Sequence, residues 1–515
     1  MARPLPDSVV IDGGPIGTDE VVAVARHGAK VEVGADVATP MVRAREHVER
    51  HLASGQAVYG ITTGFGALAD VRIEPGDIQR LQHNVIRSHA AGTGELLPAE
   101  VVRAMMLLRA RSLSAGYSGV RPILVERLAD LLNAGIHPAV PSRGSVGASG
   151  DLAQLAHIAQ CLIGEGQVLA NGGSEPAGQA LRRAGLEPLD LQAKEGIAMV
   201  NGTEGMLALG LLAEHDAAAL LTTGDITAAM SVEAALGTDG PYAAEIQELR
   251  PHPGQAASAS NFRALLEGSP IIASHRESEH AVQDPYSMRC APQVHGAARD
   301  AGSFAREVFD RERASVVDNP VILPDGRVES TGNFHGEPLA YALDLLGVAM
   351  TGVANISERR TYWLLGPGER RGLPPFLSTD AGLGSGYMLA QYTQASLVTE
   401  CKISSAPAGV DSIPTSGTQE DHVSMGWLSG LKTRRILELV TSVLAIEAVC
   451  AAQALDLRRP MEPAIGTAAV LRAIRERVPF LDADRDVSVD IRAAEELVRS
   501  GGLVEAAQAE VGELR

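Results

Sequence analysis

Three long runs of helix-forming residues constrain the fold of this chain more than any other feature. They cover Gly205 to Leu236, Glu337 to Arg360 and Gln419 to Leu455. Aromatic residues make up only 3% of the sequence, so the core must consist mainly of Ala, Leu, Val and Ile. Long helices with small, aliphatic faces pack closely side by side. We therefore predict a mainly α-helical fold built on a bundle of long helices.

Shorter patterns predict the remaining elements. A strand is expected near Val9 and small hairpins at 167–178 and 321–328, where strand residues flank turn residues. Further helices are expected at 19–27, 39–54, in most of 78–133, at 386–402 and in short stretches after 455. We predict an N-terminal domain over residues 1–200 and a second domain over 201–515 that holds the long helices and the C-terminal helices.

Charge and hydropathy exclude several classes of partner. The chain has 44 basic and 63 acidic residues, a net charge of −19, which argues against nucleic acid and anionic membranes as partners. Glu438 and Glu447 interrupt the most apolar run, Ile436 to Leu455, so a buried helix is expected there and no membrane span. Residues 1–15 lack the apolar core of a signal peptide, and we expect a cytoplasmic protein.

The cysteines indicate neither a zinc site nor a disulfide framework. Cys161, Cys290, Cys401 and Cys450 are far apart, and no Cys-x-x-Cys pair occurs. Free thiols in a reducing compartment are the expected state. The sequence also lacks a phosphate-binding loop of the Gly-x-x-x-x-Gly-Lys type and a complete dinucleotide fingerprint.

A segment of small residues precedes one of the predicted helices. Residues 144–152 read Gly-Ser-Val-Gly-Ala-Ser-Gly-Asp-Leu, and a segment with so little side-chain bulk allows close backbone approach. Asp151 is the expected N-cap for the helix that follows, and Gly164 is the expected stop. The simplest interpretation is a cramped helix entry. Residues 147–151 also nearly match a Gly-x-Ser-x-Gly nucleophile elbow, but Asp at 151 disfavours a serine hydrolase.

The order Ala148, Ser149, Gly150 allows a second interpretation. In a tight enough turn, the amide nitrogen of Gly150 attacks the carbonyl carbon of Ala148, and only glycine leaves that nitrogen unhindered. Loss of one water from the ring and one from Ser149 gives a five-membered ring with an exocyclic methylene. Such a methylene is a strong electrophile, so this turn is a candidate catalytic centre.

The ten residues from Gly144 to Ala153 resemble those of the aromatic amino-acid lyases, whose cofactor is a self-made methylidene-imidazolone (MIO). Further matches extend from about residue 59 to about residue 427. Within the family the sequence is most similar to the histidine ammonia-lyases. The resemblance implies a fumarase-like helical bundle, an MIO made from Ala148, Ser149 and Gly150, and no metal or dissociable cofactor. It also implies a homotetramer whose active sites are shared between subunits.

The implied reaction is non-oxidative elimination of ammonia from L-histidine to give trans-urocanate, the first step of histidine degradation. In this resemblance Tyr59, in a glycine-rich loop, is the catalytic base. Asn201 hydrogen-bonds near the electrophile, and Phe334 flanks the ring. From the residues alone, a packed loop tyrosine and a turn asparagine remain open alternatives.

A second implied group lies at 283–289. Gln283, Tyr286 and Arg289 are three residues apart, so on a helix they share one face. In the family's pattern Arg289 grips the substrate carboxylate through a bidentate pair. Tyr286 matches a second active-site tyrosine, and Gln283 lies beside the electrophile. A polar stripe on an amphipathic helix is the alternative.

The expected substrate rests on His89 and Glu420. A histidine at the position of His89 can hydrogen-bond an imidazole, although some tyrosine-specific relatives also carry one. Relatives that act on other aromatic amino acids tend to carry Gln where this chain has Glu420. A carboxylate opposite an imidazole accepts its N–H, whereas beside a phenyl ring it would be buried without a partner.

Three alternatives stay open at this point. The chain resembles phenylalanine and tyrosine ammonia-lyases, and 2,3-aminomutases, in much of the same pattern. A non-catalytic helical scaffold descended from such enzymes is the third, which the intact Ala-Ser-Gly and Tyr59 disfavour. The chain departs from the family's usual pattern at Thr62, at Gln154 and in the loop 366–371, which bears on kinetics and on the loop around Tyr59.

Overall fold

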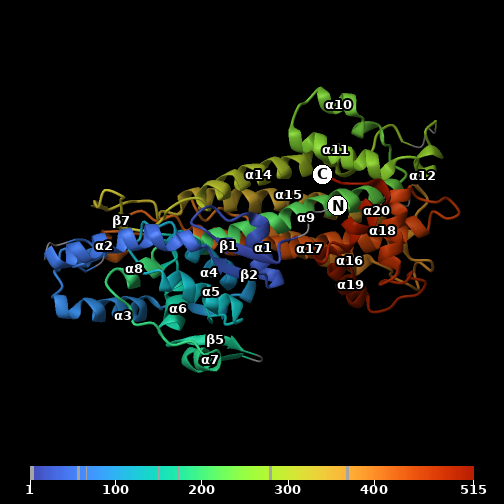
Figure 1. Ribbon diagram of the computed structural model, residues 1–515. Coiled ribbons are helices and arrows are strands. Elements are labelled where there is room, and N and C mark those ends of the chain that lie inside the picture. Colours follow the sequence, from blue (N-terminus) through green and yellow to red (C-terminus); the bar gives the residue numbers. More distant parts are fainter. Residues whose placement is uncertain are drawn as a thin grey trace.

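The long helices run along the length of an elongated molecule (Figure 1). The structure, a computed structural model, describes residues 5–54, 58–64, 66–148, 150–170, 173–277, 281–366 and 371–515. Figure 1 places α3, α2 and α8 towards one end of the molecule and α12 and α18 towards the other. The two ends of the molecule are thus formed by different helices.

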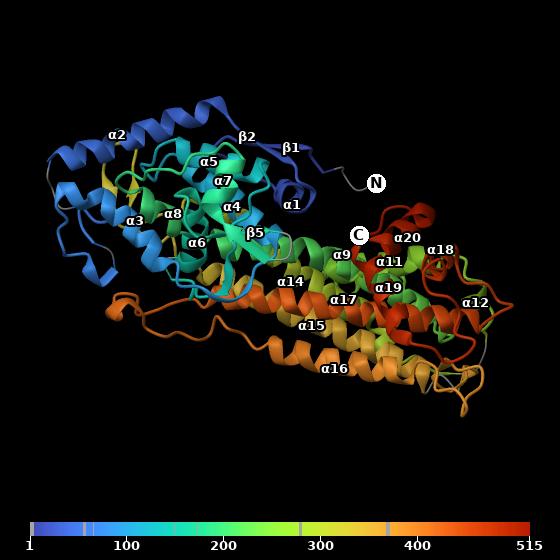
Figure 2. The same cartoon turned by 90° about the horizontal axis from the view of Figure 1, so that it is seen from below.

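The bundle is built from α9 (Glu204–Ala234), α14 (Ala291–Glu312), α15 (Glu337–Leu365) and α17 (Gly426–Asp456). Helix α17 packs against both α9 and α15, and α14 packs against α9 and α15. Helix α16 (Met388–Ser404) lies along the outer side of α15 and α17 (Figure 2). The prediction of a mainly α-helical fold built on long helices is confirmed.

Three of these helices, α9, α15 and α17, are long and apolar enough to cross a membrane by length and composition alone. Most of the apolar stretch of each is buried inside the protein, and in α17 the buried share is 89%. The apolar side chains of these helices therefore pack against one another, as expected for the run that contains Ile436 to Leu455.

Glu447, which interrupts that apolar run, is a buried partner of Arg360. The Arg360 Nη2 lies 2.8 Å from the Glu447 carboxylate, which also accepts hydrogen bonds from Ser231, Thr227 and Ser357. Burial alone would raise the pKa of Glu447, but the guanidinium of Arg360 and the hydrogen bonds from Ser357 and Ser231 together outweigh it and hold the pKa below its ordinary value. The Glu447 carboxylate is isolated among apolar residues in the sequence, but in the bundle it has charged and polar partners.

The other elements surround the two ends of the bundle. The further helices are α1 (Thr18–His27), α2 (Ala38–Ser54), α3 (Ile78–His89), α4 (Ala99–Ser114), α5 (Ile123–Asn133), α6 (Leu152–Leu162), α7 (Ala177–Arg183), α8 (Glu195–Val200), α10 (Ala244–Glu248), α11 (Pro253–Leu266), α12 (Pro270–Ala273), α13 (Tyr286–Arg289), α18 (Ile465–Arg475), α19 (Val487–Arg499) and α20 (Gly502–Val511). Short 3-10 turns are η1 (Ala35–Val37), η2 (Gly66–Leu68), η3 (Pro75–Asp77), η4 (Gly240–Tyr242), η6 (Pro375–Leu377) and η7 (Ser416–Thr418).

The strands of the described residues form small two-stranded sheets. The parallel pair is β1 (Ser8–Ile11) with β2 (Lys30–Val33), in which Ser8 lies opposite Lys30. The antiparallel pairs are β3 (Thr93–Leu96) with β4 (Pro141–Arg143), β5 (Gln167–Ala170) with β6 (Gly173–Pro176), and β7 (Val321–Ile322) with β8 (Val328–Glu329). The predicted hairpins at 167–178 and 321–328 are confirmed.

One predicted helix start is wrong. The helix expected from Gln419 begins at Gly426, because Thr415 and Glu420 pair across a turn and Met425 adopts a left-handed conformation, φ 53°. The short helix α13 begins at Tyr286, directly after Pro285.

The apolar core divides into two main clusters that meet on α9. One contains α4, α5, α6 and the first part of α9, up to Leu212, and the other begins at Ala213 and contains most of α15 and α17. The domain boundary at residue 200 stays a prediction.

Candidate active site

The turn at residues 147–150 has a backbone that only glycine tolerates at its end. Gly147 and Gly150 have φ of +71° and +77°, in the left-handed region. A Cβ on Gly150 would lie 1.8 Å from the carbonyl oxygen of Gly202. Ala148 is buried, and Ser149 lies outside the described residues. The close approach of two backbones predicted from the small residues is therefore present.

Backbone and hydroxyl donors from two other segments hold this turn. The N–H of Met425 donates to the Val146 carbonyl at 2.9 Å. The Gly147 carbonyl accepts from the N–H of Gly336 at 3.2 Å and from the hydroxyl of Ser424 at 3.1 Å. Segments far apart in the sequence thus fix the turn from two sides.

Asp151 stands at the N-cap position of α6, but its carboxylate does not cap that helix. Its backbone N–H donates to the Gly202 carbonyl at 2.7 Å, and its carboxylate accepts from the N–H of Met206 at 2.7 Å and from the Ser145 hydroxyl at 3.0 Å. Asp151 is thus the N-cap residue as predicted, but its fully buried carboxylate binds the start of α9 instead of the first turn of α6. Burial raises the pKa of Asp151 to about 7, although these hydrogen bonds act to lower it.

Four helices begin at this turn: α6 directly after it, α9 at Gly202 to Met206, α15 beside Gly336 and α17 beside Met425. The N-terminus of a helix carries a partial positive charge from its unpaired N–H groups. Four such ends at one place favour negative charge that develops on a bound group.

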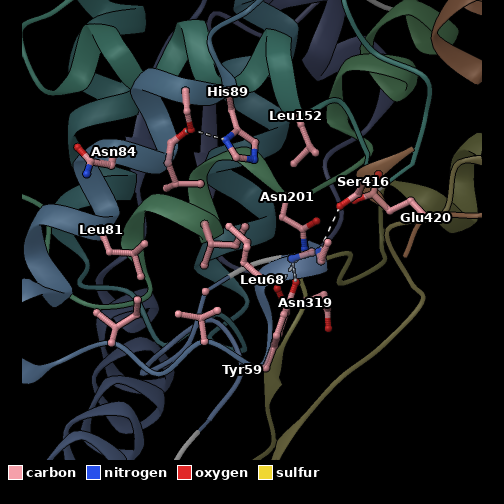
Figure 3. A pocket seen from close by; sticks show the side chains of 18 of the residues that line it. Tyr59, Leu68, Leu81, Asn84, His89, Leu152, Asn201, Asn319, Ser416 and Glu420 are labelled. Atoms are coloured by element: carbon pink, nitrogen blue, oxygen red, sulfur yellow. Dashed lines mark hydrogen bonds between the residues drawn. The ribbon is translucent and has the colours of Figure 1, made fainter. Parts of the chain in front are cut away.

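A cavity of about 990 Å³ lies beside the start of α6. Figure 3 shows Tyr59, His89, Asn201 and Glu420 around it. Its other lining residues are Gly64, Gly66, Ala67, Leu68, Val71, Ile73, Leu81, Asn84, Val85, Arg87, Ser88, Leu152, Ile197, Asn319, Ser416 and Gly417. Four of the residues predicted from the sequence therefore share one cavity.

Hydrogen bonds hold Tyr59 and Asn201 at this cavity. The half-buried Tyr59 hydroxyl accepts from the N–H of Gly66 at 3.3 Å, within its own loop. The side-chain amide of Asn201 donates to the Asn319 carbonyl at 3.3 Å and lies 3.4 Å from the Asp318 carboxylate. The predicted polar groups are thus held by the protein around the cavity.

His89 and Glu420 stand close enough to interact electrostatically. Burial lowers the pKa of His89, and the negative charge of Glu420 acts in the opposite direction to a smaller extent. The Ser88 hydroxyl lies 3.1 Å from the Nδ1 of His89, and the Thr415 hydroxyl donates to Glu420 at 2.9 Å. An imidazole and a carboxylate therefore line the same cavity, next to the loop that carries Tyr59.

Sequence reasoning missed several lining residues. Leu81 and Val85 precede His89 on α3 by eight and four residues, so the helical spacing back from His89 would have found them. Asn319 and Ser416 come from loops and carry no signal of that kind.

Two of the three departures from the family's pattern have local partners, and the third, the loop 366–371, lies mostly outside the described residues. The Thr62 hydroxyl accepts from the N–H of Val58 at 2.8 Å inside the loop that carries Tyr59. The buried Gln154 side chain donates to the Pro141 carbonyl at 3.2 Å and ties α6 to β4. Both residues therefore serve the local structure around the turn.

Gln283, Tyr286 and Arg289 form a second cluster, as predicted. The Arg289 Nη2 donates to the side-chain oxygen of Gln283 at 3.0 Å, and the guanidinium carbon lies 4.5 Å from the centre of the Tyr286 ring. The Arg289 Nε donates to the Asp284 carbonyl at 3.0 Å. These side chains do not line the cavity that contains Tyr59.

The two clusters lie at opposite ends of α9. Asp151 binds Met206 at its start, whereas the Asp284 carboxylate accepts from the N–H of Thr238, just past its end, at 2.7 Å. A 31-residue helix is about 46 Å long at 1.5 Å per residue. Within one chain Arg289 is therefore too far from the cavity to touch the same small molecule as Tyr59.

Phe334 does not line the cavity either. It is half-buried, two residues before Gly336, whose N–H binds the Gly147 carbonyl. The predicted aromatic is thus placed near the turn through its own loop.

A family model described as aromatic amino acid lyase matches residues 16–476, most of the chain. The chain belongs to the aromatic amino acid lyase family. The match covers both the turn at 147–150 and the cluster at 283–289.

Individual relatives in this family match over almost their whole length. The chain is 48% identical to the histidine ammonia-lyase of Streptomyces avermitilis, over 98% of this chain and 99% of the relative. Among solved structures, it resembles histidine ammonia-lyase from Trypanosoma cruzi at 38% identity with a TM-score of 0.90, over 98% and 95% of the two chains. It also resembles tyrosine aminomutase from Streptomyces globisporus at 37% identity with a TM-score of 0.95, over 99% and 100%.

We expect Gly150→Ala to destabilise the protein more than a matched glycine substitution. Gly268 has a similar φ of +69°, and no atom lies within 4 Å of the place that a Cβ would occupy, so Gly268→Ala is expected to cost only about 1–2 kcal/mol. Gly150→Ala adds displacement of the Gly202 backbone to the same strain. Thermal unfolding of the two variants measures the difference, and equal losses would contradict the close approach.

We expect Asp151 to make stability depend on pH. Because folding raises its pKa from 3.8 to about 7, its stabilising contribution is complete below 3.8 and is lost as pH rises towards 7. The free energy of unfolding of the wild type relative to Asp151→Asn should therefore fall between about pH 4 and about pH 7 and then stay level. A difference that does not change over this range would show that the carboxyl group titrates normally.

Proposed function

We propose that this protein eliminates ammonia from L-histidine to give trans-urocanate, the first step of histidine degradation, in the cytoplasm. The observation that carries the proposal is the cavity beside the small-residue turn, which combines Tyr59, His89, Asn201 and Glu420. The name of the relative that is 48% identical over 98% of this chain supports the choice of substrate. The free state of Cys161, Cys290, Cys401 and Cys450 is compatible with a reducing compartment.

The backbone at Gly150 fits an MIO made from Ala148, Ser149 and Gly150. The left-handed φ of Gly150 and the absence of room for a Cβ there support a ring-closing turn. Once formed, the ring supplies an electrophilic methylene that turns the substrate's amino group into a good leaving group. The four helix N-termini around the turn favour the negative charge that accumulates there during reaction.

In this proposal the cavity residues orient L-histidine and move its proton. Tyr59 removes the β-proton from the substrate as general base, and Asn201 hydrogen-bonds the substrate near the turn. Glu420 accepts a hydrogen bond from the N–H of the substrate's imidazole. His89, at the end of α3, forms a hydrogen bond with the same ring. Fixing the ring in this way aligns the β-carbon with Tyr59.

A second subunit completes the site in this proposal. Arg289 grips the substrate carboxylate, with Tyr286 and Gln283 beside it, but α9 separates these residues from the cavity of their own chain. The symmetric solution is a closed oligomer in which each cavity receives the 283–289 segment of a neighbour. Phe334 is proposed to flank the ring from its loop next to the turn.

Exposed apolar residues support a homotetramer. Tyr341, Leu345 and Val348 form a stripe along one face of α15, at intervals of four and three residues. Leu389 and Tyr392 are exposed on the neighbouring α16. Exposed apolar side chains grouped on neighbouring helices in this way are typical of subunit interfaces.

A tyrosine-specific reaction is the second candidate. The high structural similarity to tyrosine aminomutase favours this candidate. An aminomutase of this fold would return the ammonia to the β-carbon. Separate assays with L-histidine, L-phenylalanine and L-tyrosine, with product identification, distinguish the candidates. Growth of urocanate's ultraviolet absorbance with L-histidine alone supports the proposal, and β-tyrosine as the main product would contradict it.

We expect Ser149→Ala to lose nearly all turnover while the fold is retained. The measured mass of the wild-type protein should be lower than the mass calculated from its sequence by two water molecules. The Ser149→Ala variant should not lose the water that comes from the Ser149 hydroxyl. Intact-protein mass spectrometry, circular dichroism and the urocanate assay measure these three properties. Substantial lyase activity in Ser149→Ala would refute the role of the electrophile.

We expect Glu420→Gln to weaken the use of L-histidine by about tenfold to a hundredfold in kcat/KM, the loss typical of a charged hydrogen bond of about 1.5–3 kcal/mol. The control is Glu400→Gln, on exposed α16, which pairs with Arg435 and lies outside the cavity. Steady-state kinetics of both variants provide the test. Unchanged histidine kinetics in Glu420→Gln would contradict its role in binding the imidazole.

We expect two inactive variants to restore activity when their chains are mixed. Tyr59→Phe and Arg289→Met alter opposite halves of a shared site, so random co-assembly leaves about a quarter of the sites with both residues intact. Tyr59→Phe with Asn201→Ala is the matched control, because both residues line the cavity of one chain. Co-expression followed by the urocanate assay measures recovery, and equal recovery in both pairs would contradict a shared site.

A further inference from the structure

Three metal-ligating side chains, none of which lines the cavity, meet near the turn. The Nδ1 of His335 and the Nε2 of His422 each lie 4.0 Å from Oε2 of Glu337. The two imidazole rings are stacked, with centroids 5.7 Å apart and an angle of 4° between their planes. The three ligand atoms lie within 4.8 Å of one another.

Hydrogen bonding leaves two electron-rich atoms facing each other in this cluster. The Nε2 of His335 lies 3.2 Å from the backbone carbonyl of His422, and a carbonyl only accepts, so Nε2 carries the hydrogen. In the neutral ring Nδ1 then presents a lone pair towards Glu337. The Oε2 of Glu337 is buried and has no hydrogen-bond partner among the described residues. A lone pair opposite an unpartnered carboxylate oxygen is unfavourable unless a positive centre, either a metal ion or a proton, lies between them.

We infer that His335, Glu337 and His422 bind a divalent transition-metal ion of the zinc type. Two imidazole nitrogens and one carboxylate oxygen form a ligand set that Zn²⁺, Co²⁺ and similar ions accept. The hydrogen bond from His335 to the His422 carbonyl is the kind of outer contact that fixes the tautomer of a ligating histidine. This inference stands independently of the proposed reaction.

The geometry needs only a small closure. Ligand atoms around a tetrahedral Zn²⁺ lie about 3.4 Å apart, given metal–ligand distances near 2.1 Å. The observed separations are 4.0 Å from each histidine to Glu337 and no more than 4.8 Å between any two of the three ligand atoms. Side-chain rotation would shorten them to that value, and His422 has room to rotate because its side chain is 67% exposed. The same exposure gives an ion a route from solvent and leaves a fourth position open to water.

An ion here would join the two segments that hold the turn. Gly336, between His335 and Glu337, donates to the Gly147 carbonyl. Ser424 and Met425, soon after His422, donate to the carbonyls of Gly147 and Val146. The metal therefore serves as a clip between the starts of α15 and α17, outside the reaction itself. No local sequence pattern indicates this cluster, because His422 lies 87 residues from His335.

The test uses full-length, tag-free protein that has been treated with a chelator and dialysed. Calorimetric titration with Zn²⁺ should show one ion per chain, and Co²⁺ should give visible absorption bands typical of nitrogen and oxygen ligands. Glu337→Gln and His422→Gln should each lower the affinity by at least about tenfold. Circular dichroism checks that the variants fold, and the exposed His422 makes at least that variant tolerant of substitution.

The matched control is His252→Gln. His252 is an exposed histidine with a carboxylate, that of Asp300, 3.9 Å away, so its loss should leave the stoichiometry and affinity unchanged. The inference is overturned if Zn²⁺ does not bind to the wild type, or if Glu337→Gln and His422→Gln bind as tightly as His252→Gln. Because binding is measured directly, either result is independent of whether the protein uses L-histidine.

Discussion

The contact between the backbones of Gly150 and Gly202 is the constraint on which the rest of the site depends. A carbonyl that occupies the place of a Cβ fixes the turn against the start of α9, and the starts of α15 and α17 close it from the other side. The long bundle supplies this arrangement, since parallel packing of its helices brings several N-termini to one level. The same helix ends thus provide the packing that stabilises the fold and the partial positive charge that suits the reaction.

Much of the fold was predictable because it depends on local patterns. Long Ala- and Leu-rich runs with few breakers predicted the bundle, and turn residues between short apolar runs predicted the hairpins at 167–178 and 321–328. The start of α17 was predicted wrongly because tertiary contacts decided it. The Thr415–Glu420 pairing and the left-handed Met425 have no signature in a helical pattern.

The site was predictable only where the residues repeat a family's motif or a helical spacing. Tyr59, His89, Asn201 and Glu420 come together as the resemblance implied, although they span more than 350 positions of the chain. Asn319 was missed because it enters from a loop. The resemblance supplied roles for Gln283, Tyr286 and Arg289, but only the structure revealed how far they lie from the cavity.

The length of helix α9 has a consequence for assembly. Its first turn binds Asp151 beside the cavity, while the backbone just past its far end binds Asp284, in the segment that carries Arg289. If the site is shared between subunits as proposed, an isolated and fully folded subunit lacks one half of every site, so turnover begins only after assembly. An insertion or a kink within this one helix would then misalign two neighbouring centres at once.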